Sequence, residues 1–192
     1  GAMKSGTTTL HQMLSRHPQV FIPNEEVHFF DLDNLLQHPD FNWFDGTSWT
    51  RQALEDQPDR YWDWYSSHFS AAKPGQKLGE DSTTYIASEA AMRRIAVQPR
   101  PIRLIVMLRH PTKRAYSQYW HLVRTGRATH TFEDTIQNTP HVVLDRSMYL
   151  QQLRGMLLHI PRERIEVVIF EEFVSDTAGA LERICDHLEI DR

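Results

Sequence analysis

The sequence predicts an α/β fold in which a parallel sheet is flanked by helices. Two runs, residues 102–108 (IRLIVML) and 165–170 (IEVVIF), are rich in β-branched residues and almost continuously apolar, as is typical of strands buried on both faces of a parallel sheet. Helix-like stretches at about residues 112–125 and 147–158 lie between them. This alternation predicts crossover helices, and hence an open α/β sheet.

The first helix is predicted to begin after Gly6, because Leu10, Met13 and Leu14 have the i, i+3, i+4 spacing of an amphipathic helix. We expect it to end near His17. A last helix is predicted over residues 177–188. Its cysteine, Cys185, is the single one in the chain and has apolar residues at helical spacing around it, so an inert, buried thiol is expected.

The region between the first helix and the strand at 102–108 is less regular. A short apolar run covers residues 20–22, and residues 31–60 mix Asp, Asn, Gly and Pro without a sustained period, which predicts an irregular insertion. A helix with an aromatic face is predicted at residues 61–69. Four aromatic residues are candidates either for the core, which is the commoner case, or for an acceptor pocket: Trp43, Trp62, Trp64 and Tyr65.

Composition and charge limit the class of protein. The 192 residues fit one domain, 1–192, and the formal net charge of −4 provides no general attraction to nucleic acid or to an anionic membrane, so any anion site must be local. No apolar run is long enough to span a membrane and no signal peptide is visible, so a cytoplasmic location is the default expectation. The sequence does not predict an oligomeric state.

A candidate anion-binding loop lies at the start of the chain. It contains one cation, one glycine and four hydroxyl groups: Lys4, Ser5, Gly6, Thr7, Thr8 and Thr9. Backbone N–H groups at a helix start bind anions, and the hydroxyls add donors. The lysine lies two residues before the glycine, whereas a nucleoside-triphosphate loop has it directly after. A plain Ser/Thr helix cap beside a surface lysine is the alternative.

A second candidate anion site follows the strand at 102–108. Arg109 leaves the carboxyl end of that strand, where ligands of open α/β sheets gather, and Pro111 can begin the next helix, which carries Ser117. An arginine that solvates a strand end is the alternative. Lys113 and Arg114 are expected to form a solvated face of this helix.

Together, KSGTT at residues 4–8 and LRHPTKRAYSQYW at 108–120 resemble the sulfotransferases that use 3'-phosphoadenosine 5'-phosphosulfate (PAPS). The resemblance implies a P-loop-like nucleotide-binding sulfotransferase fold. It implies that residues 4–9 hold the 5'-phosphosulfate, that Lys4 approaches the leaving oxygen, and that Arg109 and Ser117 contact the 3'-phosphate. The product would be adenosine 3',5'-bisphosphate.

The stretch EEVHFFD, residues 25–31, resembles the KEVHFFD of the heparan sulfate sulfotransferases, in which the glutamate that matches Glu26 is the catalytic base. Apolar neighbours at 27, 29 and 30 favour a carboxylate that readily accepts a proton. His28 is expected to support it, with Asp31 less important. RSMYLQQL, residues 146–153, is similar to a segment of the same group.

The chain departs from the heparan-type pattern in three places. Glu25 and Asp81 stand where that group has lysines, so a polyanionic acceptor is not expected. The late loop of that family, which is rich in glycine and lysine and covers the nucleotide, is not found before Arg192, and few residues precede Lys4. We therefore expect the chain to lack both an N-terminal strand and the C-terminal nucleotide-covering loop of the domain.

The sequence thus predicts sulfuryl transfer from PAPS to a hydroxyl acceptor, a carbohydrate or a small molecule. No metal is expected, because the histidines show neither H-E-x-x-H nor Cys/His spacing. Two alternatives stay open. A P-loop small-molecule kinase would need a lysine where Thr7 stands. A non-catalytic nucleotide-binding domain would keep the pocket without turnover.

Overall fold

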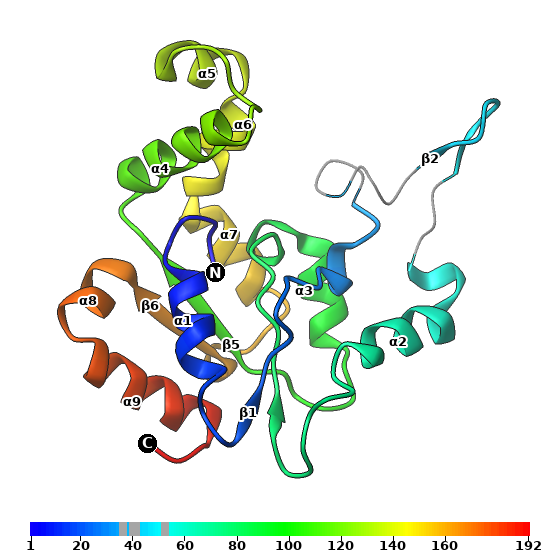
Figure 1. Ribbon diagram of the computed structural model, residues 1–192, viewed down its shortest axis with the longest axis vertical. Helices are drawn as coiled ribbons and strands as arrows, with labels where there is room; N and C mark the ends of the chain where they lie inside the picture. The colour runs from blue at the N-terminus through cyan, green and yellow to red at the C-terminus, as the bar shows by residue number, and fades with distance from the viewer. Residues whose placement is uncertain (35–37, 39–42, 51–53) are drawn as a thin grey trace.

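The computed structural model describes residues 1–34, 38, 43–50 and 54–192. Its centre is the parallel pair of strands β5 and β6, which run side by side through the middle of the molecule (Figure 1). The strands of the described residues are β1 (Val20–Phe21), β2 (Trp43–Phe44), β3 (Trp49–Thr50), β4 (Lys77–Leu78), β5 (Leu104–Leu108) and β6 (Ile165–Ile169). The two long strands and their parallel pairing confirm the prediction from the apolar runs.

Helices account for most of the remaining described structure. The α-helices are α1 (Thr7–Leu14), α2 (Pro58–Ser67), α3 (Glu89–Ala96), α4 (Pro111–Arg124), α5 (Phe132–Asn138), α6 (Pro140–Val143), α7 (Tyr149–Leu157), α8 (Phe170–Ser175) and α9 (Thr177–Leu188). Short 3-10 helices are η1 (Phe29–Asp31), η3 (Leu54–Asp56), η4 (Tyr85–Ala87), η5 (Asp145–Ser147) and η6 (Arg162–Arg164). The helices predicted after Gly6 and at about 61–69, 112–125, 147–158 and 177–188 are all present.

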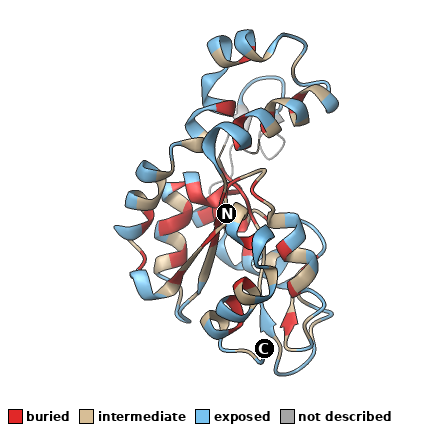
Figure 2. Ribbon diagram, turned by 90° about the vertical axis from the view of Figure 1, so that its left-hand side faces the viewer, coloured by how far each residue is buried: buried red, intermediate tan, exposed pale blue. Residues whose placement is uncertain are grey.

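Both faces of the β5–β6 pair are buried against helices. Because side chains alternate along a strand, Val106 and Leu108 pack in one cluster with residues of α3 and α7, whereas Met107 packs in another with residues of α1 and α9. Figure 2 shows the buried residues gathered along the strands and on the helix faces turned toward them. The chain passes from β5 to β6 through α4 to α7, as expected for a crossover connection.

Helices α4, α5 and α6 project beyond the carboxyl end of β5 as an arm (Figure 1). Pro111 is the first residue of α4, as predicted. The arm has a small apolar cluster of its own, with Ala115, Leu122 and Val143 buried. It is therefore joined to the main core chiefly through α4 and the segment that follows α6.

The predicted irregular insertion, residues 31–60, contains only short elements where it is described: β2 and β3 form an antiparallel hairpin, and η3 precedes α2. Its residues 35–37, 39–42 and 51–53 lie outside the described part of the chain, as does the side chain of Trp43. The apolar run at 20–22 supplies β1, which pairs in parallel with β4. Among the described residues, no helix has the length and apolar character needed to cross a bilayer.

The aromatic face of α2 packs on the residues of η1. The ring of Phe29 lies 4.3 Å from that of Tyr65 and 4.7 Å from that of Trp62, measured between centroids. Trp62 and Trp64 are each 38% exposed. Tyr65 and part of the Trp62 ring therefore belong to the core, as the commoner alternative predicts. Their packing on Phe29 holds η1 against α2.

The predicted solvated face of α4 is wrong at Arg114, which is fully buried, whereas Lys113 is exposed. The Arg114 guanidinium donates from Nε to Ser147 Oγ at 2.6 Å and from Nη2 to the carbonyl of Val143. Arg114 therefore hydrogen-bonds acceptors of η5 and α6 where these elements meet α4. The spacing of residues within α4 alone does not indicate these partners.

We predict that Arg114→Ala lowers the free energy of unfolding by about 2 to 4 kcal/mol, because a buried carbonyl and a hydroxyl lose a charged donor. Chemical denaturation with urea measures this change. The exposed neighbour provides a matched control, and Lys113→Ala should change the free energy by less than about 0.5 kcal/mol. Equal effects of the two substitutions would contradict the structural role of Arg114.

Candidate active site

The predicted anion loop, residues 4–9, comprises the turn beside β5 and the first three residues of helix α1. The N–H of Ala2 donates to a carbonyl of β5 at 2.8 Å, so the chain enters the loop beside the central strand. Lys4 and Gly6 both have left-handed backbones, with φ of 66° and 85°. A Cβ on Gly6 would lie 2.6 Å from the ring of Phe170, so both the backbone and the packing require glycine.

A cavity of about 440 Å³ opens over this loop. The predicted site residues that line it are Lys4, Gly6, Thr7, Thr8, Thr9, Glu26, Arg109 and Ser117. They come from α1 and its preceding loop, from the segment before η1, from the end of β5 and from α4. Ser5 and His28 do not line the cavity: Ser5 is fully buried under the loop, and His28 is a hydrogen-bonding neighbour of Glu26.

Sequence reasoning missed five residues of the cavity wall, namely Met3, Thr83, Gln118, His121 and Phe170. A usable signal existed for His121, which lies one helical turn after Ser117 and so shares its face of α4. None existed for Thr83 or Phe170, because long-range folding brings them to the cavity.

Arg109 is held between the loop and the sheet. Its Nη1 donates to the carbonyl of Lys4 at 3.1 Å, and its guanidinium carbon lies 4.9 Å from the ring centroid of Phe170, a cation–π arrangement. The hydroxyl of Tyr149 donates to the carbonyl of Arg109 at 2.8 Å. The side chain is thus fixed at the cavity wall.

The cavity is locally positive although the whole chain is acidic. Burial lowers the pKa of the Lys4 ammonium, and the nearby cations Arg124 and Arg109 lower it further. The pKa of His121 is lowered by burial and then by Lys4 and Arg124. Within the described ranges, no carboxylate forms an ion pair with Lys4 or Arg109. Uncompensated cations at a helix start favour an anionic ligand.

Glu26 brings a carboxylate to the wall of the same cavity. Its Oε2 accepts hydrogen bonds from the N–H of Thr83 at 3.0 Å and from the Thr83 hydroxyl at 2.9 Å. The side chain is 36% exposed and also contacts His28. Within the described residues all of these contacts are made to Oε2, which leaves Oε1 for a ligand hydroxyl.

His28 links this carboxylate to the segment 80–85. Its Nε2 lies 3.2 Å from Glu26 Oε2, and its Nδ1 lies 3.0 Å from Thr84 Oγ1. Burial lowers the pKa of His28, which favours the neutral ring. A neutral ring that donates from Nε2 to Glu26 and accepts at Nδ1 from Thr84 satisfies both contacts.

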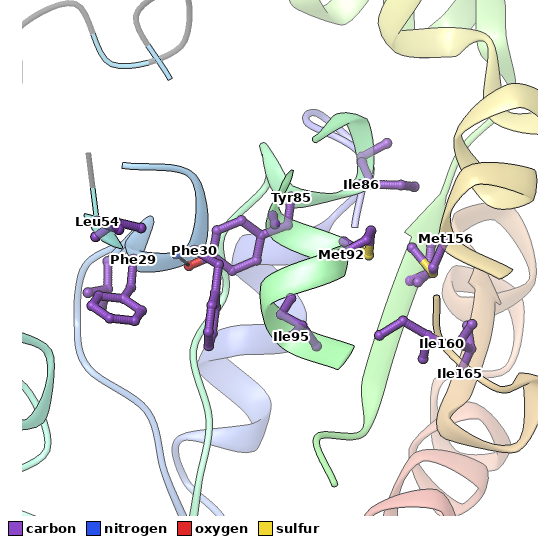
Figure 3. Close-up of a cluster of buried hydrophobic side chains, with 14 of the residues drawn as sticks. Phe29, Phe30, Leu54, Tyr85, Ile86, Met92, Ile95, Met156, Ile160 and Ile165 are labelled. Atoms are coloured by element: carbon purple, nitrogen blue, oxygen red, sulfur yellow. Dashed lines mark hydrogen bonds between the residues drawn. The ribbon is translucent and has the colours of Figure 1, made fainter. Parts of the chain in front are cut away.

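The rings of Phe29 and Phe30 are buried in the main hydrophobic cluster. Figure 3 shows both rings in the buried cluster with Leu54, Tyr85 and Ile95. The immediate neighbours of the carboxylate are therefore polar, and the apolar surroundings expected from the sequence are not those of Glu26 itself.

Asp31 is fully buried and accepts from His38 Nε2 at 3.1 Å. Within the described residues, His28, Asp31 and His38 form a group whose nitrogen and oxygen atoms lie within 4.8 Å of one another. Asp31 and His38 are joined in this group by their direct hydrogen bond. Asp31 does not line the cavity.

Asp81 and Glu25, which stand where the heparan-type pattern has lysines, have different surroundings. Asp81 pairs with His11, whose Nδ1 lies 2.9 Å from Asp81 Oδ1, and burial raises the pKa of this carboxyl. Glu25 is exposed beside Glu26. Neither contributes positive charge to the mouth of the cavity.

Known proteins share both the sequence and the fold. Mouse heparan sulfate glucosamine 3-O-sulfotransferase 5 is 27% identical over 96% of the chain, and the human 3-O-sulfotransferase 3B1 is 28% identical over all of it. The chain spans 50% and 45% of these two relatives. The crystal structure of a sulfotransferase from Alicyclobacillus acidocaldarius has a TM-score of 0.79 and 27% identity, with all of this chain and 79% of that one covered.

A second solved structure, the sulfotransferase domain from the curacin biosynthetic pathway, has a TM-score of 0.68 at 18% identity and supports the fold alone. The model of the Sulfotransferase family matches residues 1–192. With the whole length matched, the chain belongs to the sulfotransferase family.

Proposed function

We propose that this chain transfers a sulfuryl group from PAPS to a hydroxyl acceptor, a carbohydrate or a small molecule. One observation supports this most strongly: uncompensated cations at the start of α1 and a partly exposed carboxylate line the same cavity. The cations suit an anionic donor, and the carboxylate suits removal of a proton from an acceptor. The heparan sulfate sulfotransferases among the relatives support a carbohydrate acceptor.

The cavity residues fit the two ends of such a donor. The helix start with Thr7, Thr8 and Thr9 offers N–H and hydroxyl donors to the phosphosulfate. Arg109 and Ser117, at the end of β5 and on α4, would hold the 3'-phosphate. A charge-assisted contact from an arginine fixed by Phe170 and Lys4 needs little reorganisation when the phosphate binds.

In the reaction, the acceptor oxygen forms a bond to sulfur, the sulfur–oxygen bond to the 5'-phosphate breaks, and adenosine 3',5'-bisphosphate leaves. Glu26 takes the proton of the acceptor hydroxyl. Lys4 stabilises the negative charge that develops on the leaving phosphate oxygen. Burial, and then the cations Arg124 and Arg109, lower the pKa of Lys4, and an anion in the cavity would offset the effect of those cations.

His28 would act through Glu26 and not on the acceptor. Its Nε2–H contact holds one carboxylate oxygen, as does Thr83, which leaves the other oxygen to meet the acceptor. Holding the base in one orientation reduces the entropy lost on reaching the transition state. No charged imidazolium is required, in agreement with the lowered pKa of His28.

The two alternatives differ from this proposal in specific residues. A P-loop kinase would have a lysine where Thr7 stands, and the lysine here lies on the other side of Gly6. A non-catalytic binding domain would have no use for Glu26 in the cavity wall. A donor screen that includes ATP with magnesium distinguishes the kinase, and turnover distinguishes the binding domain.

We predict that the protein releases adenosine 3',5'-bisphosphate from PAPS in the presence of an uncharged hydroxyl acceptor. A panel of methyl glycosides, 4-nitrophenol, n-octanol and heparan sulfate, followed by chromatography of the nucleotide, measures this release. Heparan sulfate should not be the best acceptor, because Glu25 and Asp81 would repel a polyanion. A preference for ATP with magnesium over PAPS would overturn the proposed donor. A preference for heparan sulfate over the uncharged alcohols would overturn the expected class of acceptor.

We predict that Arg109→Ala weakens the binding of adenosine 3',5'-bisphosphate by about 1.5 to 3 kcal/mol while the binding of AMP changes little. The difference arises because AMP lacks the 3'-phosphate. Isothermal titration calorimetry with both nucleotides measures it. The exposed Arg100 provides the control, since Arg100→Ala should affect neither nucleotide. Equal losses for both nucleotides in Arg109→Ala would remove Arg109 from this role.

We predict that Glu26→Gln lowers turnover by about 10² to 10⁴ with nucleotide affinity nearly unchanged, because the amide keeps the Thr83 contacts and cannot take a proton. The matched control is the adjacent exposed carboxylate, Glu25→Gln, which should retain turnover on a neutral acceptor. Near-full activity of Glu26→Gln together with an inactive, folded His28→Ala would assign the base to His28 instead.

A further inference from the structure

We propose that Glu80 is a positioning residue that holds the catalytic segment, residues 26–31, through the hydroxyls of Ser82 and Tyr85. The proposal rests on the function proposed above, because it assigns Glu80 a part in orienting Glu26 and His28. Glu80, Ser82 and Tyr85 do not line the cavity, so they are not expected to contact the nucleotide.

Residues 82–85 contact the catalytic segment one after another. The N–H of His28 donates to Ser82 Oγ at 2.9 Å, and the N–H of Phe30 donates to the Tyr85 hydroxyl at 3.0 Å. Between them, Thr83 donates twice to Glu26 and Thr84 contacts the ring of His28. Ser82, Thr83, Thr84 and Tyr85 are all buried. Residues 82–85 thus hold both the backbone and the side chains of the catalytic segment.

Glu80 joins the two backbone contacts. Its Oε1 accepts from the Tyr85 hydroxyl at 2.5 Å, and its Oε2 accepts from the Ser82 hydroxyl at 3.3 Å. Because each hydroxyl gives its proton to Glu80, its oxygen is left to accept from an N–H of the catalytic segment. The carboxylate therefore sets the direction of both hydrogen bonds.

The segment needs such a restraint. His28 has φ of 56°, a left-handed backbone that is uncommon outside glycine. A residue in this region stays there only when its surroundings fix it in several ways. Ser82 holds the N–H of His28, and Tyr85 holds the N–H of Phe30 two residues later. The two contacts together restrain the backbone at the strained position.

The surroundings of Glu80 make its carboxyl depend on these contacts. The pKa of Glu80 is raised to about 7, chiefly by burial; the hydroxyls of Tyr85 and Ser82 lower it, and the carboxylates Asp31 and Asp81 raise it. Burial, and then the negative charge of Glu80, raise the pKa of the Tyr65 hydroxyl. A buried carboxyl among other acids is unfavourable unless it is hydrogen-bonded, and Tyr85 and Ser82 supply those bonds.

Turnover and nucleotide affinity of Glu80→Gln and Tyr85→Phe test the proposal. Both should lower kcat about tenfold, since each removes an acceptor or a donor that directs a hydrogen bond. Affinity for adenosine 3',5'-bisphosphate should remain within about twofold, which also shows that the variants are folded. The matched control is Glu163→Gln, an exposed glutamate in η6, and it should retain wild-type kcat.

A double variant separates positioning from a general structural effect. If Glu80 acts through the catalytic segment, adding Glu80→Gln to Glu26→Gln should lower the residual kcat by at most about twofold. A full tenfold further loss in the double variant would contradict the proposal. So would wild-type kcat in Glu80→Gln.

The ring of His28 provides a readout that needs no acceptor. Long-range ¹H–¹⁵N correlation spectra should show altered Nδ1 and Nε2 shifts for His28 in Glu80→Gln and Tyr85→Phe, and unaltered shifts in Glu163→Gln. Unaltered His28 shifts in all three would overturn the positioning role. If the wild-type protein turned over no acceptor, the proposed sulfuryl transfer would fail, and these spectra would still decide whether Glu80 positions the segment.

Discussion

The close packing of Gly6 against Phe170 is the constraint on which the cavity depends. The ring touches the position that a Cβ would take, so the loop can lie directly on the first residue after β6. The same ring carries the Arg109 guanidinium and lines the cavity. One aromatic side chain thus sets the distance between the start of α1 and the end of β5, and a larger residue at position 6 would separate the two anion-binding elements.

The parts of the fold that the sequence predicted are those with a local signal. The apolar runs of β5 and β6 pack into clusters on both faces of the pair, and the two strands run parallel. The helices after Gly6 and after Pro111 carry their own start signals. The pattern also indicated the loop and Glu26, and the fold brings Glu26 and all of residues 4–9 except Ser5 to one cavity.

The parts that could not be predicted depend on contacts between distant segments. Arg114 is buried because Val143 at the end of α6 and Ser147 in η5 supply its acceptors. Phe29 and Phe30 turn into the core because α2 and α3 offer apolar surfaces there, which leaves Glu26 among polar neighbours. Thr83 reaches Glu26 across 57 positions of the chain, and nothing in either segment alone indicates that contact.

The arm formed by α4, α5 and α6 has a small core of its own, yet Ser117, Gln118 and His121 on α4 form one wall of the cavity. A unit with so few buried apolar residues has a low free energy of local opening. Any such opening would remove that wall while β5 and β6 remained folded. Occupancy of the cavity and order in the arm are therefore thermodynamically linked, so a ligand held by α4 would slow amide hydrogen exchange in helices that it does not touch.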